Sequence, residues 1–436
     1  MNDESIFVQI ASYRDPELVP TVLDLLENAD RPDNIKICIC WQYDDSENLL
    51  LIKEYNNVEV ISVPYYESKG ACWARNQIQR RYNGERYTLQ LDSHHRFVQG
   101  WDTILKNMYQ QCKLMGSDKP LITTYIPSFD PFQNKDTYEM IPWQMNFHKF
   151  LPEGAVFFMP APIRDHEKYT APIPARFYSA HFAFTDGVFC EEVMHDPEYY
   201  FYGEEISIAV RAFTHGYDLY HPHKVVAWHE YTRSSRTKHW DDHNFVNTNF
   251  KGITKNWWER DNASQKRNRV LFDMEQDNNV VIPEKYKFGK KRSVKDYEKY
   301  AGINFKEKSY SIYTLSGKIP PTPFTEDFIT DENPDPANIT TIVKKTNVSY
   351  KQIFDGGDIV SLRFKVLNNE NKIVTVGAFD SQILSIFKNV TTQTLAEYKI
   401  PLNFKFDTTK PDDQFSCKLY AIDTFGSEKL LVHLKL

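Results

Sequence analysis

The sequence predicts an α/β protein with a mainly parallel sheet, followed by a small all-β, sandwich-like domain. Short runs of apolar and β-branched residues alternate with segments of helical periodicity in the first hundred residues, a pattern typical of βαβ units. After residue 337 the helical segments give way to short alternating runs separated by turn residues, which is typical of a β-sandwich. At 436 residues the chain is long enough for more than one domain.

The predicted strands of the parallel sheet are Ile6–Ile10, Ile35–Trp41, Val58–Val63 and Tyr87–Asp92. A helix is predicted over residues 19–26, because its apolar residues recur three and four positions apart. Ligands of such sheets bind beyond the carboxyl ends of the strands. The chain has neither G-x-G-x-x-G nor G-x-x-x-x-G-K-[ST], so neither a dinucleotide fold nor a P-loop is indicated.

Polar and charged residues follow each of these strands, and we expect them to share one crevice. They are Ser12 and Arg14, then Asp44 and Asp45, then Lys69, and finally Asp92 and His94.

A divalent metal site is predicted at the end of the fourth strand. Asp92 and His94 lie two positions apart where a strand gives way to a loop, and carboxylate and imidazole ligands suit Mn²⁺ and similar ions. The alternative is a strand-end turn with solvated polar residues, since the Asp-x-His spacing is short. His229 ends a run, Val225–His229, that is typical of a buried strand. It is the candidate third ligand, although a surface cluster of histidines is the alternative.

Several motifs resemble those of known glycosyltransferases. The runs Leu91–His94, Gly100–Trp101, Tyr202–Ser207 and Val226–His229 are similar to metal and catalytic motifs of the mucin-type polypeptide N-acetylgalactosaminyltransferases. The runs Ile10–Pro16 and Lys69–Asn76 resemble more closely the cytoplasmic, hydroxyproline-directed polypeptide N-acetylglucosaminyltransferases and their bacterial relatives. The resemblance covers roughly residues 5–260.

The resemblance implies a GT-A fold, a UDP-sugar donor, a divalent cation (Mn²⁺ or Mg²⁺) and retention of the anomeric configuration. It makes Asp92, His94 and His229 the metal ligands and Glu204 the active-site glutamate. It also places Asp44 or Asp45 at the uracil edge, and it places Arg75 on the helix that flanks the diphosphate. The run Phe201–Glu205 departs from the Trp-Gly-Gly-Glu-Asn of the mucin-type enzymes, which leaves donor-sugar and acceptor specificity open.

Other charged residues have two interpretations each. Lys69, Arg75 and Arg233 can supply cations to the diphosphate, or they can be ordinary solvated residues. Of Glu204 and Glu205, one is expected to face the acceptor or the sugar hydroxyls, and the other to start a helix over residues 205–214.

His181 completes the donor-binding candidates. It lies on a strand predicted over Phe177–Phe184, which follows an ordered loop region over residues 125–175 that is rich in proline and aromatic residues. Long functional loops of this kind commonly act as lids or acceptor platforms.

The predicted function is transfer of N-acetylglucosamine from UDP-GlcNAc to a hydroxyl of a protein or glycan acceptor. A UDP-GalNAc or other UDP-hexose transferase of capsule or surface glycan synthesis is the nearest alternative. A metal-dependent phosphohydrolase and a non-catalytic sugar-binding protein represent other classes. UDP release, phosphate release and inactivity would distinguish these classes.

The predicted domains are a GT-A domain over residues 1–260, a helical extension with a proline-rich linker over 261–336, and a β-sandwich over 337–436. The predicted strands of the last domain are Ile359–Leu367, Ile373–Phe379, Tyr398–Phe406, Cys417–Ile422 and Leu430–Leu436. It is expected either to bind the acceptor or mediate oligomers, or to stabilise the fold.

The hydrophobic pattern, the cysteines and the net charge bear on where the protein is located and on its partners. A signal peptide and an integral membrane segment are not indicated, and six cysteines without a C-x-x-C motif are expected to be free thiols. The chain is therefore expected in the cytoplasm, either free or peripheral at the inner face of the membrane. A net charge of −7 argues against nucleic acid as a partner.

Overall fold

The computed structural model of the protein describes residues 4–151, 154–232, 236–244, 247, 253–322, 328–330, 340–349, 359–367, 373–378, 399–408, 415–423 and 428–435. The chain divides into two compact units. The first is Met1–Ala301 with Ile319–Pro321, and the second is Gly302–Lys318 with Thr322–Leu436.

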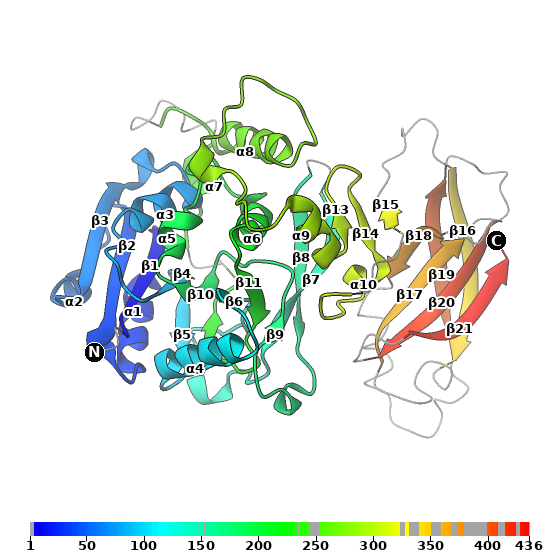
Figure 1. Ribbon diagram of the computed structural model, residues 1–436, viewed down its shortest axis with the longest axis horizontal. Helices are drawn as coiled ribbons and strands as arrows, with labels where there is room; N and C mark the ends of the chain where they lie inside the picture. Colours follow the sequence, from blue (N-terminus) through cyan, green and yellow to red (C-terminus); the bar gives the residue numbers. More distant parts are fainter. Residues whose placement is uncertain are drawn as a thin grey trace. The chain divides into compact units, whose positions relative to one another are not determined.

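The first unit is built on an eight-stranded sheet with the order β3-β2-β1-β4-β10-β6-β11-β9 (Figure 1). Its parallel strands are β1 (Ile6–Tyr13), β2 (Ile35–Tyr43), β3 (Val58–Pro64) and β4 (Tyr87–Asp92). The strands β6 (Pro120–Thr123), β9 (Ile173–Pro174), β10 (Phe182–Asp186) and β11 (Asp218–His221) complete it. β10 is antiparallel to both neighbours, β4 and β6. The α/β class with a mainly parallel sheet is therefore confirmed.

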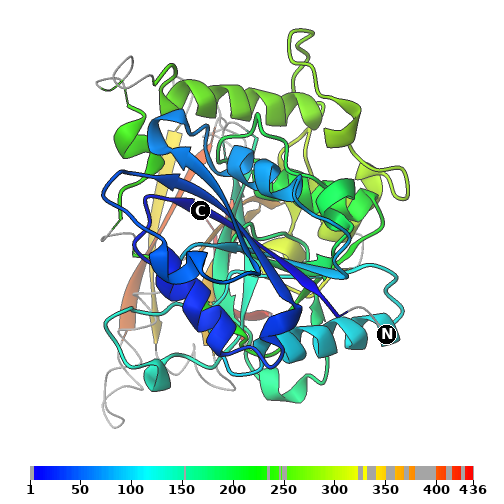
Figure 2. The same cartoon turned by 90° about the vertical axis from the view of Figure 1, so that its left-hand side faces the viewer.

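Helices cover both faces of this sheet (Figure 2). The longer ones are α1 (Leu18–Glu27), α3 (Ala71–Gln79), α4 (Trp101–Leu114), α6 (Glu204–Thr214), α8 (Trp257–Leu271) and α9 (Val294–Ala301). The short ones are α2 (Leu50–Lys53), α5 (Phe189–Glu192) and α7 (His239–Asp242). Single 3₁₀ turns lie at Pro32–Asn34, Tyr65–Glu67, Lys135–Thr137, His166–Lys168 and Glu284–Tyr286.

Alternation along β1 builds two cores. Ile6, Val8 and Ile10 point to the face covered by α1 and α4, where they join the main core. Phe7 points to the opposite face and packs in the cluster that contains Ala74 of α3. A strand buried on both faces is typical of the centre of a parallel sheet.

Two small sheets complete the first unit. β5 (His95–Phe97) pairs with β12 (Ala227–His229), and β7 (Trp143–Phe150) pairs with β8 (Val156–Pro162). The β7–β8 hairpin lies inside residues 125–175, so the interpretation of that whole region as a loop was wrong. Phe147 and Phe158 face each other across the hairpin and are both buried. Such a cross-strand aromatic pair stabilises the hairpin relative to an irregular loop.

The strand predicted over Phe177–Phe184 begins later, at Phe182. The reason is local hydrogen bonding. Ser179 donates its N–H to the side chain of Thr123 at 2.8 Å rather than to a neighbouring strand. Propensity alone does not report such a competing bond.

The first compact unit extends through α8 and α9 to Ala301, whereas the sequence placed a boundary at residue 260. α9 packs on α6 through Phe213 and Tyr297, whose ring centroids lie 5.4 Å apart. The Tyr297 hydroxyl also donates to the carbonyl of Arg176 at 2.6 Å. Through these contacts α9, which was predicted to belong to a separate helical extension, packs as part of the first unit.

The second unit is antiparallel throughout its described strands. β13 (Ile303–Asn304), β14 (Ser309–Ser311) and β15 (Phe328–Thr330) form one sheet, with α10 (Ile312–Leu315) following β14. β16 (Thr340–Ser349) pairs with β19 (Lys399–Thr408). A four-stranded sheet has the order β18 (Ile373–Ala378), β17 (Ile359–Leu367), β20 (Ser416–Asp423) and β21 (Glu428–Lys435).

Among the described residues after 337 the predicted β character is confirmed, and the limits of the predicted strands agree to within a few residues. Leu362, Val366, Cys417 and Leu419 are buried at alternate positions of β17 and β20, so one face of the four-stranded sheet is covered. The packing of two sheets as a sandwich stays a prediction.

All six cysteines are buried and free of disulfides, as expected. Within the described ranges, every helix is too short or too polar to cross a bilayer.

The α4 core contact offers a test of the fold. Trp101 is fully buried and donates its indole N–H to the carbonyl of Leu25 at 2.9 Å. We expect Trp101→Ala to lower the free energy of unfolding by about 3–5 kcal/mol. On the same helix, Leu114 is 88% exposed, so Leu114→Ala is the matched control. This substitution should change the free energy of unfolding by less than about 0.5 kcal/mol. Urea unfolding followed by circular dichroism measures both, and equal effects would contradict the assigned core.

Candidate metal centre and active site

Three predicted ligands meet at the carboxyl edge of the parallel strands. β4 ends at Asp92, and a short turn then carries His94 to the start of β5. Thr21 of α1 holds this turn, because its hydroxyl donates to the carbonyl of Ser93 and accepts from the N–H of His95, each at 2.9 Å. β12 pairs with β5 so that His229 lies opposite His95. This pairing places His229 beside the end of β4, although it lies more than a hundred positions later in the sequence.

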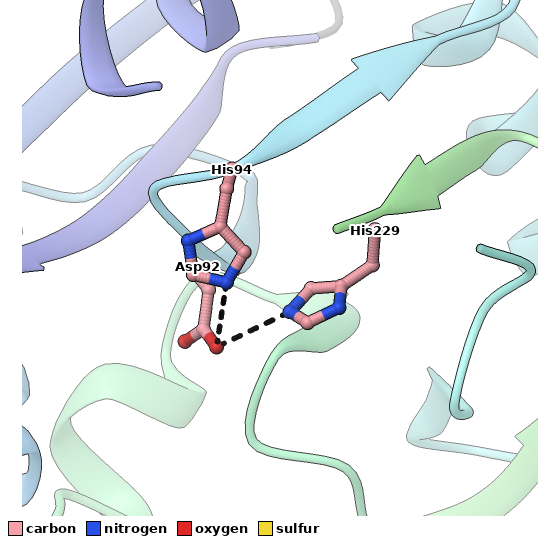
Figure 3. A group of neighbouring side chains, drawn as sticks. All are labelled: Asp92, His94 and His229. Carbon is pink, nitrogen blue, oxygen red and sulfur yellow. Dashed lines mark ion pairs between the residues drawn. The ribbon is translucent and has the colours of Figure 1, made fainter. Parts of the chain in front are cut away.

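The side chains of Asp92, His94 and His229 point toward one another (Figure 3). Oδ2 of Asp92 lies 3.5 Å from Nε2 of His229 and 3.7 Å from Nε2 of His94. One ligand atom from each residue lies within 4.8 Å of the other two. Both histidines are buried, whereas the Asp92 side chain is 27% exposed, so the group opens to solvent on its carboxylate side.

The charges of this group suit a cation. Burial by itself would raise the pKa of Asp92, but the adjacent His229 imidazole and the positive charge of Arg75 hold it well below its usual range. Burial and the neighbouring His94 lower the pKa of His229. An ionised carboxylate beside a neutral imidazole is the protonation state that metal coordination requires.

The spacing also fits an ion. Two ligand atoms at about 2.1 Å from one ion lie roughly 3.0–3.5 Å apart when their angle at the ion is 90–110°. Both ring nitrogens of His229 are buried without a hydrogen-bond partner, which is costly unless they bind something. Asp92, His94 and His229 can therefore hold a divalent cation after small side-chain adjustments.

A second carboxylate, Asp15, orients His94. Its Oδ2 lies 2.7 Å from Nδ1 of His94 and accepts the hydroxyl of Ser93 at 2.6 Å. Because a carboxylate only accepts hydrogen bonds, the contact with Asp15 favours the tautomer with the proton on Nδ1, which would leave the lone pair of Nε2 toward Asp92. Burial would raise the pKa of Asp15, but His94 and Arg236 together lower it to about 2. Arg236 contacts both His94 and Asp15, the latter at 3.1 Å.

Arg75 connects the metal group to the predicted catalytic glutamate. Its guanidinium donates to Asp92 at 2.8 Å and to Glu204 at 2.7 Å. The other oxygen of Glu204 contacts the thiol of Cys72. Arg75, Glu204 and Cys72 are all buried. Glu204 is the first residue of α6, so its carboxylate also lies at the positive end of a helix.

Glu205 lies in a separate environment beside Glu204. Its two oxygens accept from the N–H of Ala180 at 2.9 Å and from the Tyr125 hydroxyl at 2.7 Å. Burial raises the pKa of Glu205 to about 7, and the nearby charge of Glu204 contributes. Glu205 can therefore hold a proton near neutral pH.

His181 lies behind the metal group. Its ring centroid is 4.3 Å from that of His229 and 5.0 Å from that of Tyr125. Its Nε2 accepts from the N–H of Ile126 at 3.4 Å, so this nitrogen is occupied by the chain itself. Burial lowers the pKa of His181, which keeps the positive charge of the centre low.

The other predicted donor-binding residues also lie at the strand ends. Ser12 is buried with its hydroxyl unpaired. Arg14 donates to both oxygens of Asp242 in α7, at 2.9 and 2.8 Å, and lies 3.6 Å from Asp44. Asp45 and Lys69 are exposed. Arg233 lies outside the described residues.

The sequence analysis missed three residues of this region: Asp15, Arg236 and Asp242. Asp15 lies in the run Ile10–Pro16 and follows the end of a predicted strand, and this position could have marked it as a residue of the site. Arg236 and Asp242 follow β12 without any periodicity that would mark them. Their partners, Asp15 and Arg14, are more than 200 positions away.

Comparison with known proteins assigns the family. The family model described as Glycosyltransferase (GlcNAc) matches residues 5–55 and 48–307. The chain therefore belongs to this glycosyltransferase family. Among curated proteins, none matches.

Solved structures that are similar include GalNAc-T7 with UDP, GalNAc and Mn²⁺, at 16% identity and a TM-score of 0.44, covering 64% of this chain and 53% of that one. This chain thus spans about half the length of GalNAc-T7. TarS of S. aureus is similar at 9% identity and a TM-score of 0.37, covering 98% of this chain and 77% of TarS. Residues 1–349 of TarS in complex with UDP-GlcNAc match at 12% identity and a TM-score of 0.33, covering 62% and 73% of the respective chains.

The role of Asp15 can be tested by metal binding. We expect Asp15→Asn to weaken Mn²⁺ binding about 10-fold to 100-fold, because the carboxylate no longer fixes the tautomer of His94. Glu17→Gln is the matched control, since Glu17 pairs with Arg96 instead. Isothermal titration calorimetry of the folded variants measures the affinity. Equal affinity in the two variants would show that Asp15 does not orient the ligand.

The raised pKa of Glu205 predicts a pH effect on stability. The folded state binds this proton more tightly than the unfolded state, whose carboxyl has a pKa near 4.5. Protonated Glu205 therefore contributes fully to the free energy of unfolding below about pH 4.5, and this contribution is lost as the pH rises through about 7. We expect Glu205→Gln to gain stability relative to the wild type between pH 5 and pH 8. Melting temperatures at both pH values measure this, and a pH-independent difference would contradict it.

Proposed function

We propose that this glycosyltransferase moves N-acetylglucosamine from UDP-GlcNAc to an acceptor hydroxyl, with retention of the anomeric configuration and with Mn²⁺ or Mg²⁺ bound by Asp92, His94 and His229. The observation that carries the proposal is the convergence of these three side chains at the carboxyl edge of the parallel strands, within residues matched by the family model. UDP-GalNAc is the second candidate donor.

The bound cation would supply positive charge that stabilises the leaving diphosphate as the glycosidic bond breaks. Asp92 would hold this ion with its single negative charge. His94 and His229 are positioned as ligands without adding charge when neutral, so the site keeps a net attraction for phosphate. The partial exposure of Asp92 leaves an open side for the donor.

Glu204 is suited to orienting a substrate rather than attacking it. Its oxygens are engaged by Arg75 and Cys72, whereas a double displacement needs a carboxylate free to reach the anomeric carbon. This supports a front-side path, in which the departing phosphate helps to deprotonate the acceptor. Glu205, with a pKa of about 7, can hold a proton near the acceptor.

We also propose that the enzyme acts in the cytoplasm, on a protein or glycan acceptor, and that the second unit has an accessory role.

A donor screen with the 436-residue chain tests the proposal. We expect UDP release from UDP-GlcNAc in the presence of Mn²⁺, weaker release from UDP-GalNAc, and loss of activity in excess EDTA. Asp92→Asn and His229→Gln should each lower kcat/KM by at least about a hundredfold. His166→Gln, at a half-buried histidine outside the metal group, is the control and should have no effect.

Three outcomes would overturn the assignment. Full activity in EDTA would remove the metal role. Release of inorganic phosphate from simple esters, without UDP release, would indicate a phosphohydrolase. A β coupling of the anomeric proton in the product, measured by NMR, would contradict retention.

A further inference from the structure

A run of four apolar residues, Val280–Pro283, lies at the surface in the segment that joins α8 to α9. The side chain of Val281 is 74% exposed. The run borders a cavity of about 510 Å³, whose lining also includes Val270, Leu271 and Phe288. Single exposed aliphatic side chains are common in soluble proteins, but a run of them beside an apolar cavity marks a contact surface. We call Val280–Pro283 the apolar tip.

Two buried arginines hold the backbone of this segment. Arg267 of α8, which pairs with Asp196 at 2.6 Å, donates to the carbonyl of Val281 at 3.0 Å. Arg211 of α6 donates to the carbonyl of Lys285, also at 3.0 Å. Because the main chain is fixed by side chains of the interior, the apolar tip loses little backbone entropy when it binds a partner.

The residues that follow the apolar tip are strongly basic. Residues 284–299 include seven lysines and arginines against three acidic residues, whereas the whole chain carries a net charge of −7. Lys287 pairs with Glu284 at 3.2 Å, and Arg292 pairs with Asp218 at 2.7 Å. The exposed lysines of this segment that form no ion pair within the described residues are Lys285, Lys290, Lys291, Lys295 and Lys299. Their charges are available to an external anionic surface.

This basic segment lies at the edge of the sheet opposite the metal centre. The N–H of Lys291 donates to the carbonyl of Thr214, the last residue of α6, at 2.9 Å. Arg292 pairs with Asp218, the first residue of β11. β11 runs in the same direction as β4, so its first residue lies at the amino edge, whereas Asp92 ends β4 at the carboxyl edge. A body bound to the basic segment therefore leaves the metal centre open.

We propose that the apolar tip and the adjoining lysines form a docking surface for an anionic lipid membrane. Lipid phosphates attract lysines close to the surface, and exposed aliphatic side chains can enter the boundary between headgroups and acyl chains. A nucleic acid backbone would also attract the lysines, but it offers no apolar medium to Val281. The combination of charge and exposed aliphatic surface therefore favours lipid. The inference goes beyond the donor chemistry and does not depend on it.

Vesicle sedimentation with the 436-residue protein tests the proposal. The vesicles contain phosphatidylcholine alone or phosphatidylcholine mixed with phosphatidylglycerol. We expect binding only to the anionic vesicles, and weaker binding as the salt concentration rises. The double variant Lys290→Gln/Lys291→Gln should lower the partition coefficient at least about tenfold. Val281→Ser should lower it at least about threefold, because less apolar surface is buried.

Matched controls remove the same side-chain types from other segments. Lys149→Gln/Lys255→Gln replaces two exposed lysines, and Leu114→Ser replaces a leucine that is 88% exposed. Both controls should bind vesicles like the wild type, and circular dichroism checks that every variant is folded.

Three results would overturn the proposal. The first is wild-type protein that stays in the supernatant with anionic vesicles. The second is equal loss of binding in the lysine variants and their control, which would place the contact elsewhere. The third is unchanged binding of Val281→Ser together with equally tight binding to heparin, which would indicate a general polyanion site instead of a membrane surface.

Discussion

The buried guanidinium of Arg75 is the interaction on which the centre depends. It lies between the carboxylates of Asp92 and Glu204, which would otherwise place two negative charges in a poorly solvated region. Removing one partner of such a buried arrangement typically costs several kcal/mol, because the remaining charge is left without compensation. One side chain of α3 thus fixes the end of β4 and the start of α6 together. The candidate metal group and Glu204 are two parts of one electrostatic unit.

The residues at the end of β1 hold the segment that follows β12 in place, as Arg75 holds the end of β4 and the start of α6. Tyr13 and Arg14 both donate to Asp242, while Asp15 accepts from Arg236 and orients His94. Three consecutive residues therefore tie the metal ligand to the segment that precedes and includes α7. Arg14 adopts a positive φ of 45°, an uncommon backbone conformation for a residue with a side chain. The ion pair with Asp242 helps to hold it.

Periodicity predicted the parallel strands, α1 and the strand that ends in His229, because burial on a sheet is a local property of the sequence. The same local signal put Asp92 and His229 at the ends of strands, where the structure also has them, whereas the grouping of Asp92, His94 and His229 followed from the resemblance. Periodicity could not show the bond from Asp15 to His94 or the two partners of Arg75, since these pairings join side chains from separate elements. It also overestimated the strand before Phe182, where side-chain hydrogen bonds replace the sheet ladder.

The antiparallel insertion of β10 has a consequence for biosynthesis. Leu91 of β4 pairs with Phe182, so one edge of β4 has no partner until about ninety further residues have been made, which takes roughly 5–20 s at ribosomal speed. An unpaired edge of this kind is open to association with other chains. His229, the third candidate metal ligand, follows later still. A nascent chain therefore completes its central sheet before it can assemble the ion site, and a chaperone that shields the β4 edge would act in that interval.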